Sequence, residues 1–268
     1  MLSNVSRWLT YSLVVLYLVL GLGLFILPGR MAAVFAWNVS SFVAMTIGGW
    51  SLGNAWAAFV AARRWRWSRI YPALAYLWLF GVLELLVILQ FHDKLRLEHP
   101  VAWLYLLTLL VNVVAALWGS VDWLRLRPVP EATGGMTPFV RGLLVVFVVF
   151  VGFLGIYGLV AQQGWPATNG GVFPEVLSLF TLRSFGAFYL ALAMSTALTL
   201  RTQNLQTVLT FSYAAFGLIT FITVAALWNV RLFDFSARPG GLAYIGVYVI
   251  VGAVAVWLMS RHGTGDAP

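Results

Sequence analysis

The stretch VFPEVLSLFTLRSFGAFYLALAMSTALTLR, residues 172–201, decides the fold because a related stretch occurs earlier in the chain. The earlier copy is VFAWNVSSFVAMTIGGWSLGNAWAAFVAAR, residues 34–63, and it aligns with the later one without a gap at an offset of 138 positions. Both copies contain an apolar run long enough to form a membrane-spanning helix. The sequence therefore predicts a duplicated helix, and the identical pairs include Val34/Val172, Phe35/Phe173, Ser40/Ser178, Phe42/Phe180, Gly48/Gly186, Leu52/Leu190 and Arg63/Arg201.

Polar residues inside the apolar runs are the candidates for function. Arg183 stands where the first copy has Met45, and Glu175 stands where it has Trp37. Charged side chains are costly within a membrane and usually face the bundle interior, where they mark functional sites. Arg183 and Glu175 are therefore candidate ligand-binding residues. Asn112 is a further candidate, for which an interhelical hydrogen bond is the favoured interpretation.

The composition is that of an integral membrane protein. Of the 268 residues, 62% are hydrophobic and 9% are charged, and the mean hydropathy is +0.92. The formal net charge is +8, but the Arg residues lie between apolar runs, where the positive-inside rule explains them without a nucleic-acid partner. The chain has no cysteine, which removes disulfides and thiolate metal sites. We expect no cofactor and no nucleic-acid partner.

Eight transmembrane spans are predicted, and the second four repeat the first four. Residues 138–162 match the first span with Gly21 opposite Gly152, and Gly81 in the third span matches Gly217 in the seventh. Because an internal segment cannot be a signal peptide, the first span is expected to be retained. The predicted spans are Leu9–Leu27, Ser41–Ala62, Ile70–Phe91, Val101–Trp118, Phe139–Ala161, Pro174–Leu200, Thr207–Trp228 and Leu242–Ser260.

A break in composition separates the two repeats. The stretch DWLRLRPVPEATGGMTP, residues 122–138, is rich in Pro, Gly and charge, as linkers are. We therefore expect an all-α integral membrane protein of two four-helix repeats in parallel orientation. An even number of spans in each repeat places the pseudo-twofold axis along the membrane normal. The expected parts are the first repeat (1–123), a cytoplasmic linker (124–137), the second repeat (138–262) and a tail (263–268).

Small residues at matching positions indicate where helices approach closely. Gly49 and Gly53 in the second span correspond to Ala187 and Ala191 in the sixth. Close packing of membrane helices depends on small residues four positions apart. These two helices are therefore expected at the central contact, while packing of each helix only within its own half is the alternative. Val60 is expected to face lipid.

Two charges in different halves suggest an ion pair. If the sixth span begins at Pro174, Arg183 lies about as deep in the membrane as Glu84. The equivalent positions in the other halves are Met45 and Thr220, so each half has one charge and lacks the other. Opposite charges reduce each other's cost at this depth, which predicts a Glu84–Arg183 pair between the halves. The pair either docks the halves or binds an anionic or quinone-like group; alternatively, Arg183 reaches the outer head groups.

One loop has the residue types of a metal site. HDKLRLEHP, residues 92–100, contains two His and two acidic residues, but Lys94 and Arg96 lie among them and repel cations. A solvated loop is the favoured interpretation, and no metal site is predicted.

Three classes of function agree with the sequence. The leading one is a non-catalytic membrane protein, either an accessory or scaffold subunit or a lipid-binding protein. The alternatives are a small transporter with a path between the repeats and an anionic or lipidic ligand near Arg183, and an integral membrane enzyme that uses Glu84 on a lipidic substrate. A polar cavity open to one side favours transport, an apolar lipid-filled one favours the scaffold, and a carboxylate at the base of a cavity favours the enzyme. The expected partners are membrane lipids, other membrane subunits or a second copy of the chain.

Basic residues predict the topology. Ten of the sixteen fall on one side if the N-terminus is cytoplasmic, so both termini are expected in the cytoplasm and the chain in the plasma membrane. Reporters fused after Arg66 and Gly134 should therefore read cytoplasmic, and those at Arg96, Asn169 and Arg238 external. A cytoplasmic reading at Asn169 would contradict the eight-span topology.

Overall fold

The structure is a computed structural model that describes residues 1–128, 135–162, 165, 173–202 and 204–262. The reporter sites at Gly134 and Asn169 and the middle of the predicted linker lie outside these ranges, as does the tail. The described residues form helices joined by short loops: α1 (Asn4–Ile26), α2 (Pro28–Ala33), α3 (Ser41–Arg64), α4 (Trp67–Gln90), η1 (His92–Lys94), α5 (Pro100–Leu126), α6 (Pro138–Val160), α7 (Leu179–Thr202), α8 (Leu205–Trp228), η2 (Val230–Leu232) and α9 (Gly240–His262).

Seven of the described helices are long and apolar enough to cross a membrane by length and composition, namely α1 and α4 to α9. α3 has 24 residues but is not apolar enough, because it includes polar residues such as Thr46, Ser51 and Asn54. The prediction of eight apolar spans is therefore confirmed for seven helices and not for α3, although a helix of spanning length stands at the predicted place. The three polar side chains are at most 4% exposed, so neighbouring helices shield them.

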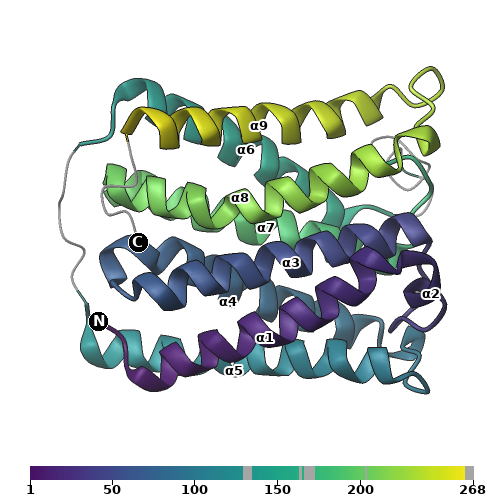
Figure 1. Cartoon of the computed structure of the whole chain (residues 1–268), viewed down its shortest axis with the longest axis horizontal. Coiled ribbons are helices and arrows are strands. Elements are labelled where there is room, and N and C mark those ends of the chain that lie inside the picture. The colour runs from purple at the N-terminus through teal and green to yellow at the C-terminus, as the bar shows by residue number, and fades with distance from the viewer. Residues whose placement is uncertain (129–134, 163–164, 166–172, 203, 263–268) are drawn as a thin grey trace.

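The long helices lie side by side in two layers (Figure 1). α1, α3, α8 and α9 form the front layer, and α5, α4, α7 and α6 lie behind them in the same order. Neighbours within a layer contact each other, and α4 also contacts α3 and α8 across the layers. α3, α4, α7 and α8 therefore occupy the centre of the bundle.

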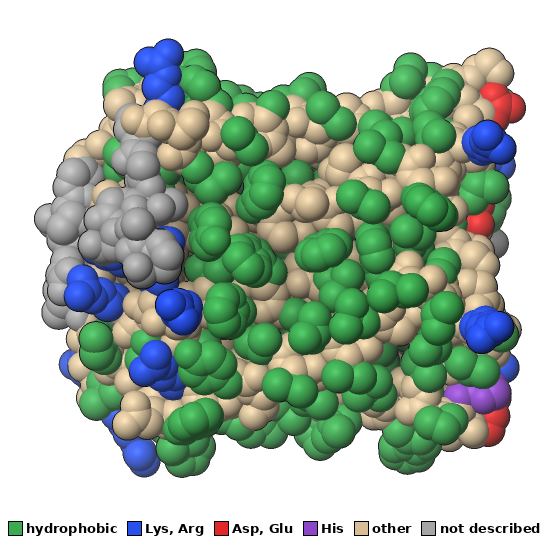
Figure 2. All heavy atoms as spheres, viewed as in Figure 1, with side chains coloured by type: hydrophobic (Ala, Val, Ile, Leu, Met, Phe, Trp, Pro, Cys, Tyr) green, Lys and Arg blue, Asp and Glu red, His purple; other side chains and the backbone are tan. Residues whose placement is uncertain are grey.

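The two ends of the molecule differ in charge. The N-terminus and the last turn of α9 lie at the same end (Figure 1). Hydrophobic side chains cover the middle of the visible face, Lys and Arg gather at the ends, and the acidic side chains in view lie opposite the N-terminus (Figure 2). This distribution is typical of a protein whose middle belt contacts lipid. The membrane and the orientation in it remain expectations from the sequence.

α7 begins later than the sequence suggested. The hydroxyl of Ser178 accepts a hydrogen bond from the Thr181 amide at 3.2 Å, as a helix N-cap does. α7 therefore starts at Leu179 rather than at Pro174. Arg183 is only four residues into the helix, about 6 Å from its start. The next residue, Ser184, donates a hydrogen bond to the Glu84 carboxylate, so Arg183 still lies at about the depth of Glu84, although it is closer to the start of its helix than predicted.

α5 extends past its predicted end at Trp118 as far as Leu126. Its last turns carry Asp122, which accepts hydrogen bonds from the Ser3 amide at 3.0 Å and from the Ser6 hydroxyl. These bonds hold the start of α1 against the end of α5. Apolar character alone did not reveal this extension, because it depends on a contact between distant parts of the chain.

Glycines allow the closest helix contacts, and they do so in both halves. A Cβ atom at Gly48 would lie 2.6 Å from the backbone nitrogen of Phe25 on α1, and one at Gly186 would lie 2.6 Å from that of Leu159 on α6. These distances are shorter than any normal contact. α1 and α3, like α6 and α7, therefore touch backbone to backbone at this level.

Gly49 and Gly53 lie where α3 meets α8. A Cβ at Gly53 would lie 2.6 Å from the Cα of Leu218, and one at Gly49 would lie 3.1 Å from the carbonyl oxygen of Phe221. Because α8 belongs to the second half of the chain, these glycines lie at a contact between the halves. Packing of α3 only within its own half is therefore excluded.

The corresponding small residues of α7 are equally buried. Ala187 and Ala191 have no exposed surface, and α7 packs closely on α4 and α6. α3 meets α7 through rings rather than through small residues, since Trp50 stacks on Phe188 with centroids 4.5 Å apart. The expectation that Val60 faces lipid is wrong, because it is only 3% exposed. α3 has neighbours around most of its circumference, so it has almost no lipid-facing side.

Replacing Gly53 by Leu should destabilise the protein. The new side chain would overlap Leu218, and α3 and α8 are packed too closely there to make room for it. Overpacking of this kind typically costs about 1–3 kcal/mol. Ala191→Leu should have a similar effect. The measurement is the melting temperature in detergent.

The control is Val15→Leu on α1, where Val15 is 61% exposed on the outer surface and has room for the larger side chain. Equal melting temperatures for all three variants would contradict close packing at α3–α8 and around α7.

Candidate functional site

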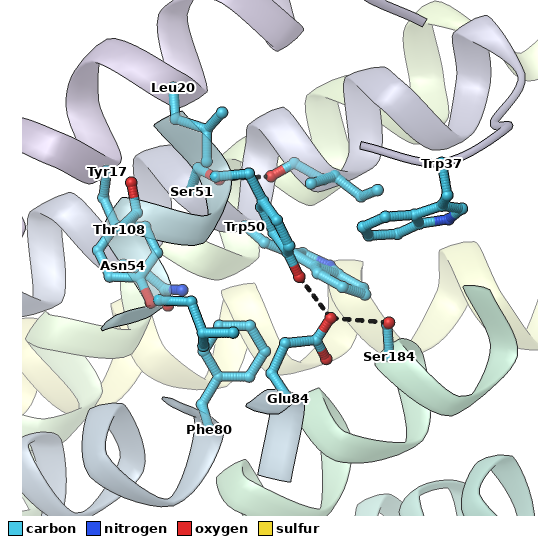
Figure 3. Close-up of a pocket in the computed structure, with 13 residues that line it drawn as sticks. Tyr17, Leu20, Trp37, Trp50, Ser51, Asn54, Phe80, Glu84, Thr108 and Ser184 are labelled. Atoms are coloured by element: carbon cyan, nitrogen blue, oxygen red, sulfur yellow. Dashed lines mark hydrogen bonds between the residues drawn. The ribbon is translucent and has the colours of Figure 1, made fainter. Parts of the chain in front are cut away.

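A small cavity inside the first half of the chain is lined by several buried polar side chains (Figure 3). It offers about 20 Å³ to the centre of a water molecule, which is room for about one ordered water. Four helices of the first half, the loop before α3 at Trp37, and α7 of the second half line it. The lining residues are Tyr17, Leu20, Trp37, Ile47, Trp50, Ser51, Asn54, Phe80, Glu84, Tyr105, Thr108, Leu109 and Ser184.

Glu84 of α4 is the one carboxylate of this cavity and is 2% exposed. Its Oε1 accepts two hydrogen bonds, from the Tyr105 hydroxyl of α5 at 2.5 Å and from the Ser184 hydroxyl of α7 at 2.8 Å. Figure 3 shows both bonds converging on the same oxygen. The Ser184 bond joins the two halves of the chain. The other carboxylate oxygen of Glu84, Oε2, has no hydrogen-bond partner among the described residues.

Two hydrogen-bond donors on α3 also lack a partner in the described structure. The indole nitrogen of Trp50 and the amide nitrogen of Asn54 are buried, and neither has a partner in the described part of the chain. The other side of the Asn54 amide is bonded, since its oxygen accepts from the Tyr76 hydroxyl at 2.7 Å. Trp50 and Asn54 are four residues apart and therefore lie on the same face of α3. The cavity thus has an unsatisfied acceptor and two unsatisfied donors around it.

Asn112 makes the interhelical bond that the sequence favoured. Its amide nitrogen donates to the Tyr17 hydroxyl of α1 at 2.7 Å, and it lies against Gly81 of α4. Its own oxygen has no partner within the described residues. Since Tyr17 lines the cavity, Asn112 supports the site from behind. Its assignment as a ligand remains a prediction.

Arg183 and Glu84 do not form the predicted ion pair. Arg183 donates to the carbonyl oxygen of Gly158 at 2.8 Å, and no ion pair between Arg183 and Glu84 occurs in the described structure. Gly158 lies in the last turn of α6, where backbone carbonyls lack partners within the helix. Arg183 therefore caps α6, and the neighbouring Ser184 takes the place that the prediction gave to Arg183.

Glu175 lies away from the cavity, just before α7. It accepts a hydrogen bond from the hydroxyl of Ser40, which is the N-cap of α3. The contact joins the starts of α3 and α7. Whether Glu175 also binds a ligand is not tested by this arrangement.

Sequence reasoning missed Trp50, Asn54, Tyr105 and Ser184. One signal was available, because Trp50 and Asn54 are spaced to share a helix face within a helix too polar for lipid. Tyr105 and Ser184 gave no such signal. Their role depends on where α5 and α7 pack against α4, which only the tertiary structure reveals.

The loop after α4 contains ion pairs of its own. The Lys94 ammonium lies 2.9 Å from the Asp93 carboxylate, and its hydrogen bond lowers the pKa of that carboxyl. His99 and Arg96 both contact Glu98 at 3.4 Å. The described residues contain no cluster of three His, Asp or Glu side chains able to hold a metal ion.

A second hollow lies on the outer surface between α8 and α9. Its volume is about 550 Å³, and its lining is mainly apolar with two threonines. Gly252 lets α9 approach α8, since a Cβ there would lie 3.2 Å from the Ile219 side chain. We call this hollow the α8–α9 groove. Its lining residues are Phe216, Ile219, Thr220, Thr223, Val224, Tyr248, Val249, Gly252, Ala253, Val256 and Trp257.

Comparison of the chain with protein-family models, with curated proteins and with solved structures finds no match.

The hydrogen bond between the halves predicts a specific energetic coupling. In a double-mutant cycle, Glu84→Met and Ser184→Ala should show an interaction energy of about 0.5–3 kcal/mol, because each change removes the partner of the other. The free energy of unfolding in mixed micelles measures it. Arg183→Met is the matched comparison, and its effect should add to that of Glu84→Met within about 0.5 kcal/mol. Coupling of Glu84 to Arg183 instead of to Ser184 would contradict the assignment.

Proposed function

We propose that this chain is a non-catalytic, lipid-binding membrane protein built from two related four-helix halves. The α8–α9 groove would hold an acyl chain of an anionic phospholipid, with the phosphate at the basic end of the molecule. The observation that carries this proposal is the combination of a large apolar groove with cationic side chains beside one end of it.

The groove has the size and chemistry of a lipid site. Its volume of about 550 Å³ falls within the range of roughly 300–1,000 Å³ that ligand pockets occupy. Val249, Ala253 and Val256 are exposed along it, so its apolar wall is open to the surroundings. An acyl chain satisfies such a wall without any polar contact.

The end of the groove at Trp257 favours an anionic head group. The Arg261 guanidinium lies 5.9 Å from the centre of the Trp257 ring, and the Phe139 ring contacts the same ring edge-on. Phe139 precedes Arg141 in the first turn of α6, so Arg141 lies at the same end of the bundle. A Trp ring with neighbouring Arg residues is typical of the membrane interface, and Arg pairs well with phosphate.

The Glu84 cavity supports transport and catalysis less well. Its room for about one water is too small for a lipidic substrate or for an organic anion. Arg183, the residue expected to attract an anion, caps α6 instead of facing the cavity. The non-catalytic interpretation agrees best with these two features.

The packing supports the proposed 4+4 repeat. Gly48 approaches the backbone nitrogen of Phe25, and Gly186 approaches that of Leu159 at the same distance. Gly21 approaches the nitrogen of Leu52, as Gly155 does that of Leu190. In these matching contacts, residues of α3 and α7 differ by 138 positions, as in the sequence alignment. Matching residues of α1 and α6 differ by 134 positions, whereas the alignment of Gly21 with Gly152 gave 131. The order of helices in the two layers agrees with a pseudo-twofold axis along the bundle.

The proposed orientation brings the groove into a fitting environment. If the protein lies in the plasma membrane with both termini in the cytoplasm, Arg261 and Arg141 face the inner leaflet. Anionic lipids there attract basic side chains. Partner membrane subunits or a second copy of the chain would then bind elsewhere on the apolar belt.

Native mass spectrometry after gentle extraction tests the lipid site. The protein should retain phosphatidylglycerol in preference to phosphatidylcholine. Ala253→Phe should abolish the retention, because the ring fills the groove. Arg261→Gln should weaken it about fivefold, as expected for loss of about 1 kcal/mol from one basic residue near the phosphate.

Arg125→Gln and Leu107→Phe are the matched controls, since both residues are exposed on α5, on the first half of the chain. Neither change should alter retention. Equal loss in Arg125→Gln and Arg261→Gln, or retention without preference for the anionic lipid, would contradict the proposal.

A further inference from the structure

We infer that the Glu84 cavity binds water and one exchangeable proton. The cavity combines a buried carboxylate with two buried N–H donors that have no partner among the described residues, and it has room for about one water molecule. The ligands of this site are therefore water and a proton rather than an organic solute.

Water matches the unsatisfied atoms on the Glu84 side of the cavity in kind. Its oxygen accepts from the Trp50 indole, and one of its hydrogens is donated to Oε2 of Glu84, whereas the Asn54 amide lies on the Tyr17 side (Figure 3). A buried polar group without a partner costs about 1–3 kcal/mol. The Trp50 indole and the Glu84 carboxylate are therefore satisfied together by one ordered water, as is common for buried polar groups.

The same water gives Glu84 a partner for proton exchange. A hydronium ion that reaches the cavity gives one proton to Oε2: an O–H bond of the hydronium breaks, an O–H bond forms on the carboxyl group, and a neutral water molecule remains. In the reverse step the water takes the proton back as hydronium, which leaves the cavity and restores the negative charge of the carboxylate. Oε1 keeps its two hydrogen bonds from Tyr105 and Ser184 in both states.

No cation competes with the proton at this site in the described structure. The titratable groups that face Glu84 are the hydroxyls of Tyr17 on α1, Tyr76 on α4 and Tyr105 on α5. α3 and α7 bring the neutral Trp50, Asn54 and Ser184. Arg183 of α7 is bonded to Gly158. The helix α8 also packs on α4, but its Tyr213 contacts Trp56 and Arg64.

Protonation of Glu84 changes a contact between the halves. The Ser184 hydroxyl donates to a charged oxygen while Glu84 is ionised, and hydrogen bonds to charged groups are stronger than those to neutral ones. When Glu84 takes up the proton, the α4–α7 bond weakens. The site therefore links the protonation state of one buried residue to the strength of the docking between the two halves.

Infrared spectroscopy of the protein in lipid bilayers, recorded over a pH series, tests the inference. Acidification should produce the C=O band of a protonated carboxyl, and this band should disappear reversibly on return to alkaline pH and shift in heavy water. Glu84→Gln should lack the band. If no pH-dependent carboxyl band is lost in Glu84→Gln, the proton site is refuted.

A pair of tryptophan variants tests the water independently of Glu84→Gln, including the case in which that variant does not fold. Trp50→Phe removes the unpaired N–H and should shift the Glu84 C=O band. Trp37→Phe is the matched control, because Trp37 also lines the cavity but its N–H already donates to Thr181 at 3.1 Å. The band should be unchanged there, and identical spectra for the two variants would overturn the assignment of a bridging water.

Discussion

The structure depends on the shielding of one polar helix from lipid. α3 carries hydroxyl, amide and indole groups through its middle, and nothing in a hydrocarbon layer can hydrogen-bond to them. It is therefore almost fully buried, with Phe59 its one large exposed hydrophobic side chain among the described residues. α1, α4 and α8 surround it, and the two-layer arrangement follows from this requirement.

Burial of α3 requires contacts closer than ordinary side chains permit. Gly48 meets the backbone of α1, and Gly53 meets the backbone of α8, on different sides of the same helix. Because membrane helices lack a hydrophobic drive to associate, such close approach provides much of the attraction between them. The hydroxyls of Tyr105 and Ser184 then supply donors to the carboxylate of Glu84, which would be costly inside the bundle without them.

Apolar runs and turn residues predicted where most of the helices lie, because a membrane span needs a fixed length of apolar chain. The errors occurred where tertiary contacts decide. Ser178 caps α7, which begins after Pro174, so Arg183 lies near the start of the helix and donates to the carbonyl of Gly158 instead of pairing with Glu84. Val60 belongs to a helix with almost no lipid-facing side, a fact that a small-residue pattern does not reveal. Glu84 was found because a charge in an apolar run stands out, whereas its donors are ordinary hydroxyls until the fold brings them together.

The most direct test of the shielding of α3 is labelling of the unmodified protein with a photoactivatable diazirine lipid, followed by mass spectrometry of its peptides. Our account predicts strong labelling along α1, α6 and α9, whose outer faces are exposed, and labelling on α3 confined to its ends and to Phe59. Labelling that recurs along one face of α3 with helical periodicity would mean that this helix faces lipid, and would contradict the account.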